Sequence, residues 1–157
     1  LVTADVNGNF EKLFSRVGKL NKSHGPFLAL LCVGTFFSDS DNDALDVYIR
    51  GQQEVPVPTY FIAGNEARTS ALHVIDSSPG GGRVGPNLHY LGSRSGVTSI
   101  GGLSVGYLSG VSMASKYHEA NGGERFAKYE THYIEEDVNA LVRAASSGTV
   151  RHVHSLR

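Results

Sequence analysis

The sequence predicts a mixed α/β fold built around a parallel sheet, and three observations carry this prediction. Three apolar runs, residues 1–4, 27–33 and 59–63, each end in turn-forming residues. Each run precedes a segment that can form a helix, which is the strand, loop and helix order of a parallel sheet. The run at 27–33 is apolar without alternation, as expected for a central strand covered on both faces. With 157 residues and 40% hydrophobic content, the chain is predicted to form one domain, residues 1–157.

The first predicted strand is followed by a turn and a helix that Asn9 can cap. Apolar side chains recur at helical spacing in that helix: Phe10, Leu13, Phe14, Val17 and Leu20. An acidic stretch at 38–46 leads to a second, short helix, with a cap predicted at Asp41 or Asn42. We interpret this stretch as a solvated helix start, because it lacks the glycine and glutamate spacing of an EF-hand calcium loop.

The second half of the chain is predicted to be less regular. A helix is predicted over 66–76, followed by a flexible, glycine-rich surface loop over 77–85. Three strands joined by glycine turns, predicted to pair antiparallel, occupy residues 88–91, 96–100 and 103–108. A polar excursion loop over 113–131 precedes a last helix over 135–145. Ile134 stands where a capping serine or threonine is expected.

Charge and cysteine content exclude several classes of protein. The 14 Lys and Arg nearly cancel the 15 Asp and Glu, so no long-range field draws the whole chain to nucleic acid or to an anionic membrane. Cys32 is the only cysteine, which excludes an internal disulfide and suits a reducing compartment; we interpret it as an inert, buried hydrophobe. The apolar runs are too short to span a bilayer, and the first residues of the given sequence lack the basic region, apolar stretch and cleavage site expected of a signal peptide. We expect a soluble intracellular protein without a membrane partner, and, because it starts at Leu1, one that has lost its natural start.

Three loops at the ends of predicted strands resemble signature segments of calcineurin-like metallophosphoesterases, which read Asp-x-His-Gly, Gly-Asp and Gly-Asn-His. Here they read Asp5-Val6-Asn7-Gly8, Gly34-Thr35 and Gly64-Asn65-Glu66. A closer resemblance, in one register over roughly residues 1–145, is to the N-terminal domain of the CwfJ family. That family comprises spliceosome-associated relatives of the RNA lariat-debranching enzyme. The segments that carry the resemblance are 4–8, 30–37, 58–61, 87–92 and 107–110.

The resemblance implies a calcineurin-like metallophosphoesterase sandwich of αββα type, in which two sheets pack face to face between helices. Family members continue past the position of Arg157 with further strands and with two C-terminal domains related to histidine-triad proteins. We therefore expect the sandwich to be incomplete at its C-terminus. The expected consequence is an uncovered apolar face near 103–108 that favours aggregation or pairing with another chain.

The resemblance also implies a cleft in which Asp5, Asn7, Thr35, Asn65 and Glu66 occupy the former metal positions. Active relatives hold two divalent ions about 3.5 to 4 Å apart, which repel by roughly 18 kcal/mol at an effective dielectric of 20 and need a bridging anion. Neutral Thr35 stands at the place of the bridging aspartate, while Asn7 and Glu66 each replace a histidine. We predict no catalysis, and no cofactor except a weakly held divalent ion at Asp5 and Glu66. In the alternative interpretation, Asp5 and Asn65 only hydrogen-bond their own turns.

The function that the resemblance implies is a non-catalytic scaffold in pre-mRNA splicing, acting in intron-lariat release or turnover in the nucleus. The implied partners are spliceosomal proteins, the lariat-debranching enzyme, and branched or intronic RNA. Residue types suited to RNA contact are Tyr48, Tyr60, Arg83, Arg94 and Tyr117. Two alternatives stay open: a metal-dependent phosphodiesterase or phosphatase with an altered metal site, and a nucleotide-binding module with an amide cradle at Gly34 or Gly64. We interpret His152 and His154 as alternate residues of a last short strand.

Overall fold

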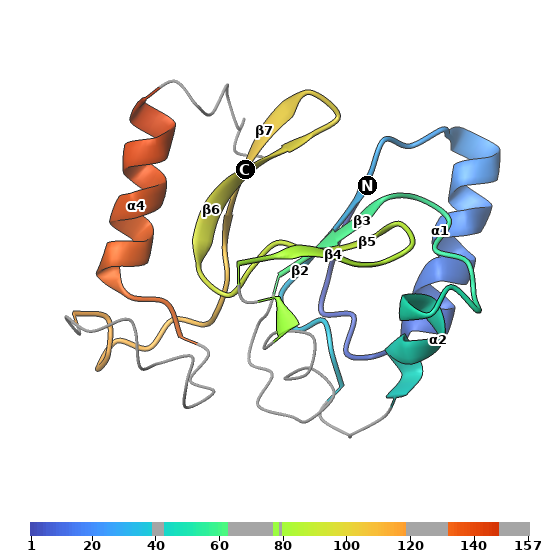
Figure 1. The fold of residues 1–157 in the computed structure, drawn as a ribbon, viewed down its shortest axis with the longest axis horizontal. Helices are drawn as coiled ribbons and strands as arrows, with labels where there is room; N and C mark the ends of the chain where they lie inside the picture. Colours follow the sequence, from blue (N-terminus) through green and yellow to red (C-terminus); the bar gives the residue numbers. More distant parts are fainter. Residues whose placement is uncertain (39–42, 63–76, 79, 119–131, 148–157) are drawn as a thin grey trace.

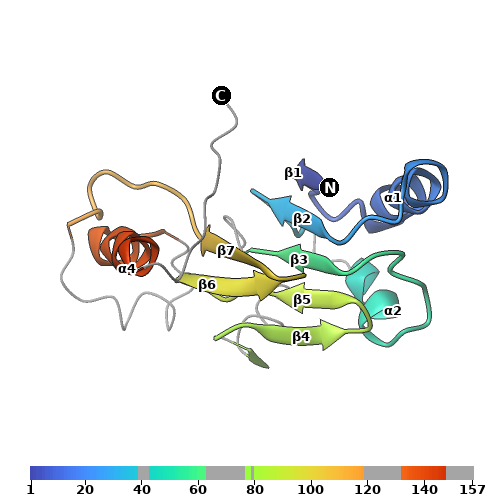
Figure 2. The same ribbon diagram turned by 90° about the horizontal axis from the view of Figure 1, so that it is seen from above.

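The computed structural model describes residues 1–38, 43–62, 77–78, 80–118 and 132–147. Their elements form layers along the long axis of the molecule (Figure 1). Helices α1 and α2 lie on one side of a five-stranded sheet, and a two-stranded hairpin followed by helix α4 lies on the other side (Figures 1 and 2). The predicted α/β class is confirmed. The finer prediction of a calcineurin-like sandwich agrees with this layer order and stays a prediction.

The five-stranded sheet has the order β1-β2-β3-β5-β4 and is mostly parallel. Its parallel strands are β1 (Val2–Ala4), β2 (Leu30–Val33), β3 (Thr59–Phe61) and β5 (Leu88–Tyr90). The first three are the strands that the apolar runs predict. Because β1, β2 and β3 run in the same direction, the loops that follow them leave from one edge of the sheet.

Helices α1 (Phe10–His24) and α2 (Asp46–Ile49), the latter preceded by a 3-10 turn at Asp43–Leu45, cover one face of this sheet. The core beneath them is aromatic. The rings of Phe36 and Phe61 stack at 4.1 Å, and the ring of Phe14 packs against that of Tyr48 at 4.7 Å. These four side chains are at most 4% exposed, and burying each one contributes roughly 2 to 3 kcal/mol.

Helix α1 begins after Asn9 as predicted, but the side chain of Asn9 does not cap it. The Asn9 Nδ2 group instead donates back to the carbonyl oxygens of Val6, at 3.1 Å, and Asn7, at 3.2 Å. Asn9 therefore stabilises the turn that precedes the helix. The caps predicted for α2 at Asp41 and Asn42 lie outside the described residues.

The hairpin consists of β6 (Ser95–Ile100) and β7 (Leu103–Leu108), which pair antiparallel as predicted. Helix α4 (Glu135–Ser146) packs against both strands. A Cβ at Gly106 would lie 3.1 Å from Leu141 Cδ1, so α4 covers the middle of β7 closely. Helix α4 therefore covers one face of β7, whereas on the other face Leu103, which is 62% exposed, and Val105 line an open hollow of apolar residues, in agreement with the predicted uncovered apolar face.

Two predictions about the glycine-rich region are wrong. Gly82–Gly85 is a strand, β4, and not part of a flexible loop. The strand β5 was expected to pair antiparallel with the strands that follow it, but it lies in the five-stranded sheet, parallel to β3 and antiparallel to β4. The glycines allow close packing here, because a Cβ at Gly85 would lie 2.9 Å from Ile49 Cα in α2. The strand β4 can thus pass directly beside α2.

Several predicted elements lie outside the described residues: the helix over 66–76, the excursion loop beyond residue 118 and the last strand with His152 and His154. Across the helices that the structure describes, none has the length and apolar character that crossing a membrane requires.

Candidate functional site

The loops after β1 and β2 pair with each other beyond the ends of the strands. The Asp5 amide donates to the Val33 carbonyl at 3.1 Å, and the Asn7 amide donates to the Thr35 carbonyl at 3.1 Å. The Gly8 amide continues the series with a 3.0 Å bond to the Phe36 carbonyl. The structure therefore brings together Asp5, Asn7 and Thr35, as the sequence predicts.

The Asp5 carboxylate is held against the neighbouring loop. Its Oδ1 atom accepts a hydrogen bond from the Thr35 amide at 3.1 Å. A Cβ at Gly34 would lie 2.3 Å from the same oxygen, so only glycine leaves room for the carboxylate, and Gly34 also has a positive φ of 67°. The Asn7 Nδ2 group donates to the Asp5 carbonyl at 2.9 Å. The Asp5 side chain therefore bonds the loop after β2, and not its own turn as the alternative interpretation has it, whereas Asn7 bonds within its own turn.

The described part of the site does not fit a two-metal centre. It offers one carboxylate, Asp5, beside the neutral side chains of Asn7 and Thr35, and two divalent ions need further anionic ligands. Among the described residues, no group of three His, Cys, Asp or Glu side chains is placed to hold a metal ion. Asn65 and Glu66 lie outside those residues, so the single ion at Asp5 and Glu66 stays a prediction.

Cys32 lies behind this edge, inside the core. It is 2% exposed, and burial raises the pKa of its thiol to about 12. The interpretation of Cys32 as a buried hydrophobe is confirmed. A thiol that stays protonated is a poor nucleophile, so Cys32 supplies no reactive group to the site.

The Cys32 thiol of the native chain is expected to react with an aromatic disulfide reagent far more slowly than that of the unfolded chain at every pH between 7 and 9. In the folded chain about one thiol in a thousand is ionised at pH 9, whereas an unfolded thiol has a pKa near 8.5. The stability linked to this group is therefore complete below about pH 8.5 and is lost as the pH rises towards 12. Labelling of the native chain and of the urea-unfolded chain, stopped at a series of times, measures the reaction rate of the thiol in each state. Labelling of the native chain as rapid as that of the unfolded chain would contradict the buried position.

Two of the residue types suited to RNA contact serve the fold instead. Tyr48 is 4% exposed and its ring packs against Phe14. Arg94 donates from Nε to Asp137 Oδ1 at 2.8 Å, and Asp137 is 2% exposed. Tyr48 is therefore too buried to bind RNA, and Arg94, although 45% exposed, is held by Asp137.

Tyr60 and Arg83 lie on the sheet face opposite the aromatic core. They flank His89 across three adjacent strands, because His89 is in register with both residues. The Tyr60 and His89 rings stack at 4.7 Å, and burial together with the nearby Arg83 guanidinium lowers the pKa of His89. The last of the residues predicted for RNA contact is Tyr117. Its ring packs against the ring of Tyr133, with the two ring centres 6.4 Å apart.

Sequence reasoning missed the role of Asp137. Its Oδ2 atom accepts the Ile134 amide at 3.0 Å, which is the bond that the acidic residue of a capping box makes to the first residue of the motif, although Ile134 stands in the place of the serine or threonine. Its other oxygen binds Arg94, which ties the helix to the start of the hairpin. The signal in the sequence was an acidic residue three positions after the cap position.

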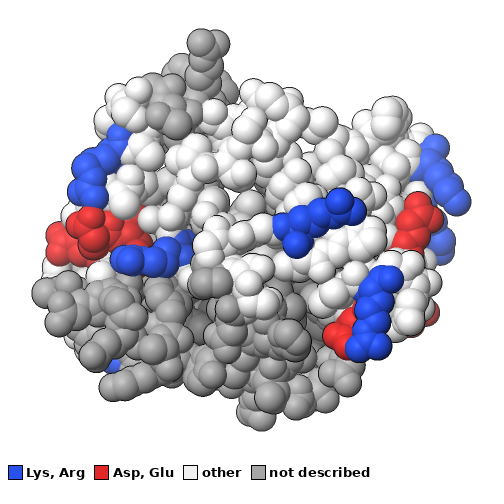
Figure 3. Space-filling model, viewed as in Figure 1, with Lys and Arg blue, Asp and Glu red and all other residues white. Residues whose placement is uncertain are grey.

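Most of the charged side chains on the face shown in Figure 3 lie at its two ends, over α4 on one side and over α1 and α2 on the other. The surface between them is mostly uncharged, apart from a basic side chain near its middle. This face of the described residues shows no continuous basic stripe of the kind that binds a nucleic-acid backbone.

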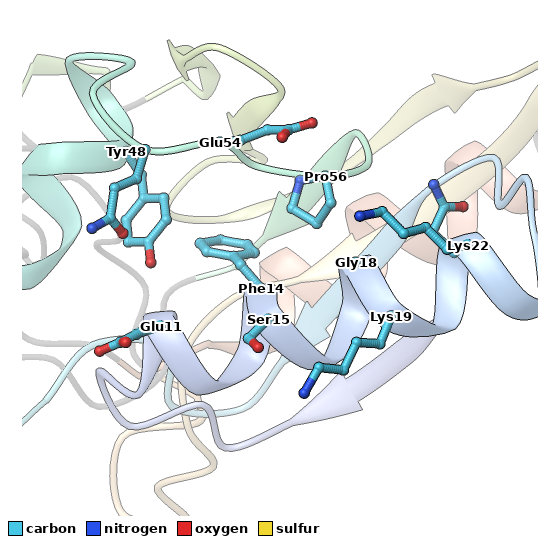
Figure 4. A pocket seen from close by; sticks show the side chains of 11 residues that line it. Glu11, Phe14, Ser15, Gly18, Lys19, Lys22, Tyr48, Glu54 and Pro56 are labelled. Atoms are coloured by element: carbon cyan, nitrogen blue, oxygen red, sulfur yellow. The ribbon is translucent and has the colours of Figure 1, made fainter.

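A hollow lies on the helical side of the molecule, between α1 and the segment that follows α2 (Figure 4). It has a volume of about 520 Å³. Phe14 and Gly18 of α1 form one side, and Tyr48, Glu54 and Pro56 lie across from them. Its lining begins at Glu11, three residues after the first signature-like loop, but no motif predicted it.

Comparison with known proteins gives the chain its relatives. No family model matches it. The chain is 40% identical over 116 residues to the CWF19-like protein 1 homolog of Caenorhabditis elegans, and 37% identical over 131 residues to that of Drosophila melanogaster. The chain is homologous to a segment of CWF19-like proteins. The aligned residues cover 74% and 82% of the chain.

The CWF19-like relatives are much longer than this chain, which spans 21% and 23% of their lengths. A rice relative (Oryza sativa subsp. japonica), 41% identical over 123 residues, is a zinc finger CCCH domain-containing protein, of which the chain spans 20%. A CCCH finger needs three cysteines and this chain has one, so the similarity to the rice protein does not include such a finger.

Proposed function

We propose that this chain is a non-catalytic, metallophosphoesterase-like scaffold within a splicing-related protein. The observation that carries the proposal is the neutral side chain of Thr35 beside the Asp5 carboxylate, which bonds to the Thr35 amide. An active site would need an anionic bridge where Thr35 stands. Here the carboxylate stabilises the neighbouring loop, and the strand-end edge is left as a binding surface.

The splicing role rests on the relatives. Their name, CWF19-like, and the resemblance of the loops to the CwfJ family both support a splicing-related factor. On this proposal the protein acts in the nucleus, in intron-lariat release or turnover. Its partners are spliceosomal proteins and the lariat-debranching enzyme, with branched or intronic RNA as a further ligand.

The alternative proposal, a metal-dependent phosphodiesterase or phosphatase with an altered metal site, requires more anionic ligands than the described loops contain. Glu66 is the residue that would have to supply one of them. The bond between Asp5 Oδ1 and the Thr35 amide leaves the second carboxylate oxygen for a metal ion, so the neutral side chain of Thr35 is the feature that separates the two proposals. The scaffold proposal requires no further anionic ligand.

Affinity purification of the tagged full-length protein from nuclear extract tests the splicing role. We expect the purified material to contain late splicing complexes and excised introns, because a scaffold of lariat release contacts both. A parallel purification with the tag alone gives the background. Recovery of neither the complexes nor the introns above that background would contradict the proposed role.

A further inference from the structure

The two edges of the five-stranded sheet differ in how they are protected from pairing with another strand. β4 lies at one end of the sheet and β1 at the other (Figure 2). β4 carries Arg83, and its pairing register shifts between Arg83 and Gly85. A charged side chain and an irregular register are two devices that keep an edge strand unpaired. β1 (Val2–Ala4) has no charged residue, no proline and no shift of register, so it is the unprotected edge.

The main chain of β1 has hydrogen-bonding groups on its free side. The Leu1 carbonyl accepts a bond of 2.9 Å from β2, and the Asp5 amide donates one of 3.1 Å to β2. Alternate residues of a strand direct their main-chain groups to opposite sides, so those of Val2 and Ala4 point away from β2. No strand that the structure describes lies on that side of β1. β1 therefore offers the N–H and C=O groups of two residues to a further strand.

An apolar hollow of about 360 Å³ adjoins this edge, between the sheet and the hairpin. Every side chain that lines it is apolar, and Val2 belongs both to the hollow and to the free edge. Three of the lining residues are large and exposed: Val2 is 70%, Leu28 57% and Leu103 62% exposed. Single exposed apolar residues are ordinary, but a cluster of them beside a free strand edge marks an interaction surface.

We propose that the β1 edge and this hollow bind a β-strand from a part of the same polypeptide that lies outside residues 1–157. The strand bonds to the main-chain groups of Val2 and Ala4, which extends the sheet beyond β1. Its side chains on one face are apolar and fill the hollow, because the lining offers no polar or charged side chain to a different kind of face.

The size of the site favours a tethered occupant over a separate protein. β1 has three residues, and ten residues line the hollow. A specific interface between separate proteins commonly uses about 20 to 30 residues on each side. A strand of the same polypeptide binds through fewer contacts, because its tether keeps its effective concentration high. The CWF19-like relatives contain enough chain to supply it, since the present chain spans only 21% and 23% of two of them.

A second copy of the chain fits the site less well. Antiparallel pairing of two β1 strands would join only three residues of each copy, which is far below the size of a stable interface. The strand proposal rests on the length of the relatives and on the β1 edge. It does not use the proposed scaffold role of the loops after β1 and β2, so it holds or fails separately from that role.

Amide hydrogen exchange in the full-length protein, followed by NMR with the N-terminal segment isotopically labelled, tests the proposal. We expect the Ala4 amide to exchange at least about tenfold more slowly than in an unstructured peptide of the same sequence, because the added strand bonds it. The Asp5 amide bonds to the Val33 carbonyl within the sheet itself. Its protection reports whether the sheet is intact in each variant.

Two substitutions in the hollow should remove the protection of Ala4. Val2→Lys and Leu103→Lys are each expected to raise the exchange rate of the Ala4 amide in the full-length protein by about tenfold, because a lysine does not fit an apolar hollow. Val142→Lys is the matched control, since Val142 is also apolar and 57% exposed but lies on α4, outside the hollow lining. It should leave the rate within about twofold, and the Asp5 amide should stay protected in all three variants.

The proposal is overturned if the Ala4 amide of the full-length protein exchanges at the rate of the unstructured peptide, or if Val2→Lys and Leu103→Lys leave its rate unchanged. Residues 1–157 alone should show no protection of Ala4 at low or at high concentration. Protection that rises with the concentration of residues 1–157 would overturn the proposal in favour of a second copy. Protection of the full-length protein that requires added nuclear extract would overturn it in favour of a separate protein.

Discussion

Replacement of Asp137 by alanine is expected to lower the free energy of unfolding by about 3 kcal/mol. Asp137 is 2% exposed and accepts hydrogen bonds from the Ile134 amide and from Arg94 Nε. Losing a cap costs about 1 kcal/mol, and breaking a buried pair costs about 3 to 5 kcal/mol. Arg94 is 45% exposed, so water screens part of its loss and the lower end of that range applies. Thermal melts should show a midpoint about 6 to 12 °C lower.

Glu136→Ala is the matched control for this prediction. Glu136 is the neighbouring acid on α4, it pairs with Arg143, and its side chain is 57% exposed. Removing such an exposed pair should change the free energy by less than about 1 kcal/mol. If Asp137→Ala and Glu136→Ala destabilise the chain equally, then Asp137 does not hold α4 to the hairpin.

Replacement of Gly34 by alanine is expected to destabilise the chain by about 2 to 4 kcal/mol. The φ of 67° at Gly34 costs an alanine about 1 to 2 kcal/mol, and the added Cβ would lie 2.3 Å from Asp5 Oδ1. The carboxylate must then move, which breaks its bond to the Thr35 amide. Urea unfolding of both chains measures the difference.

Two variants separate the steric effect from the backbone effect. Gly102→Ala has a comparable φ of 84° but nothing within 4 Å of the added Cβ, so it should cost only about 1 to 2 kcal/mol. In an Asp5→Ala background, Gly34→Ala should cost no more than Gly102→Ala, because the clashing oxygen is gone. Equal costs of Gly34→Ala with and without Asp5 would contradict the placement of the carboxylate.

The elements that local sequence determines were predictable. Strands β1, β2 and β3 follow from short apolar runs that end in turn formers, and α1 and α4 follow from apolar residues at helical spacing. Because the strands are parallel, the meeting of Asp5, Asn7 and Thr35 at one edge was predictable too.

The features that depend on distant contacts were not predictable. β4 looked like a flexible loop because its glycines are turn formers locally, but it is a strand in which Gly85 fits beside Ile49. The pairing of Arg94 with Asp137 joins residues 43 positions apart. The hollow beside α1 depends on where the segment with Glu54 and Pro56 passes the helix, which no local pattern fixes.

Hydrolysis in excess manganese tests the absence of catalysis most directly. The purified chain is incubated with branched RNA and with a generic phosphodiester, beside the Asp5→Ala variant and an active lariat-debranching enzyme as positive control. We predict no turnover by the chain and no difference from Asp5→Ala, because the neutral side chain of Thr35 offers no bridging anion. Manganese-dependent hydrolysis that Asp5→Ala abolishes would contradict the scaffold account and establish a working metal site.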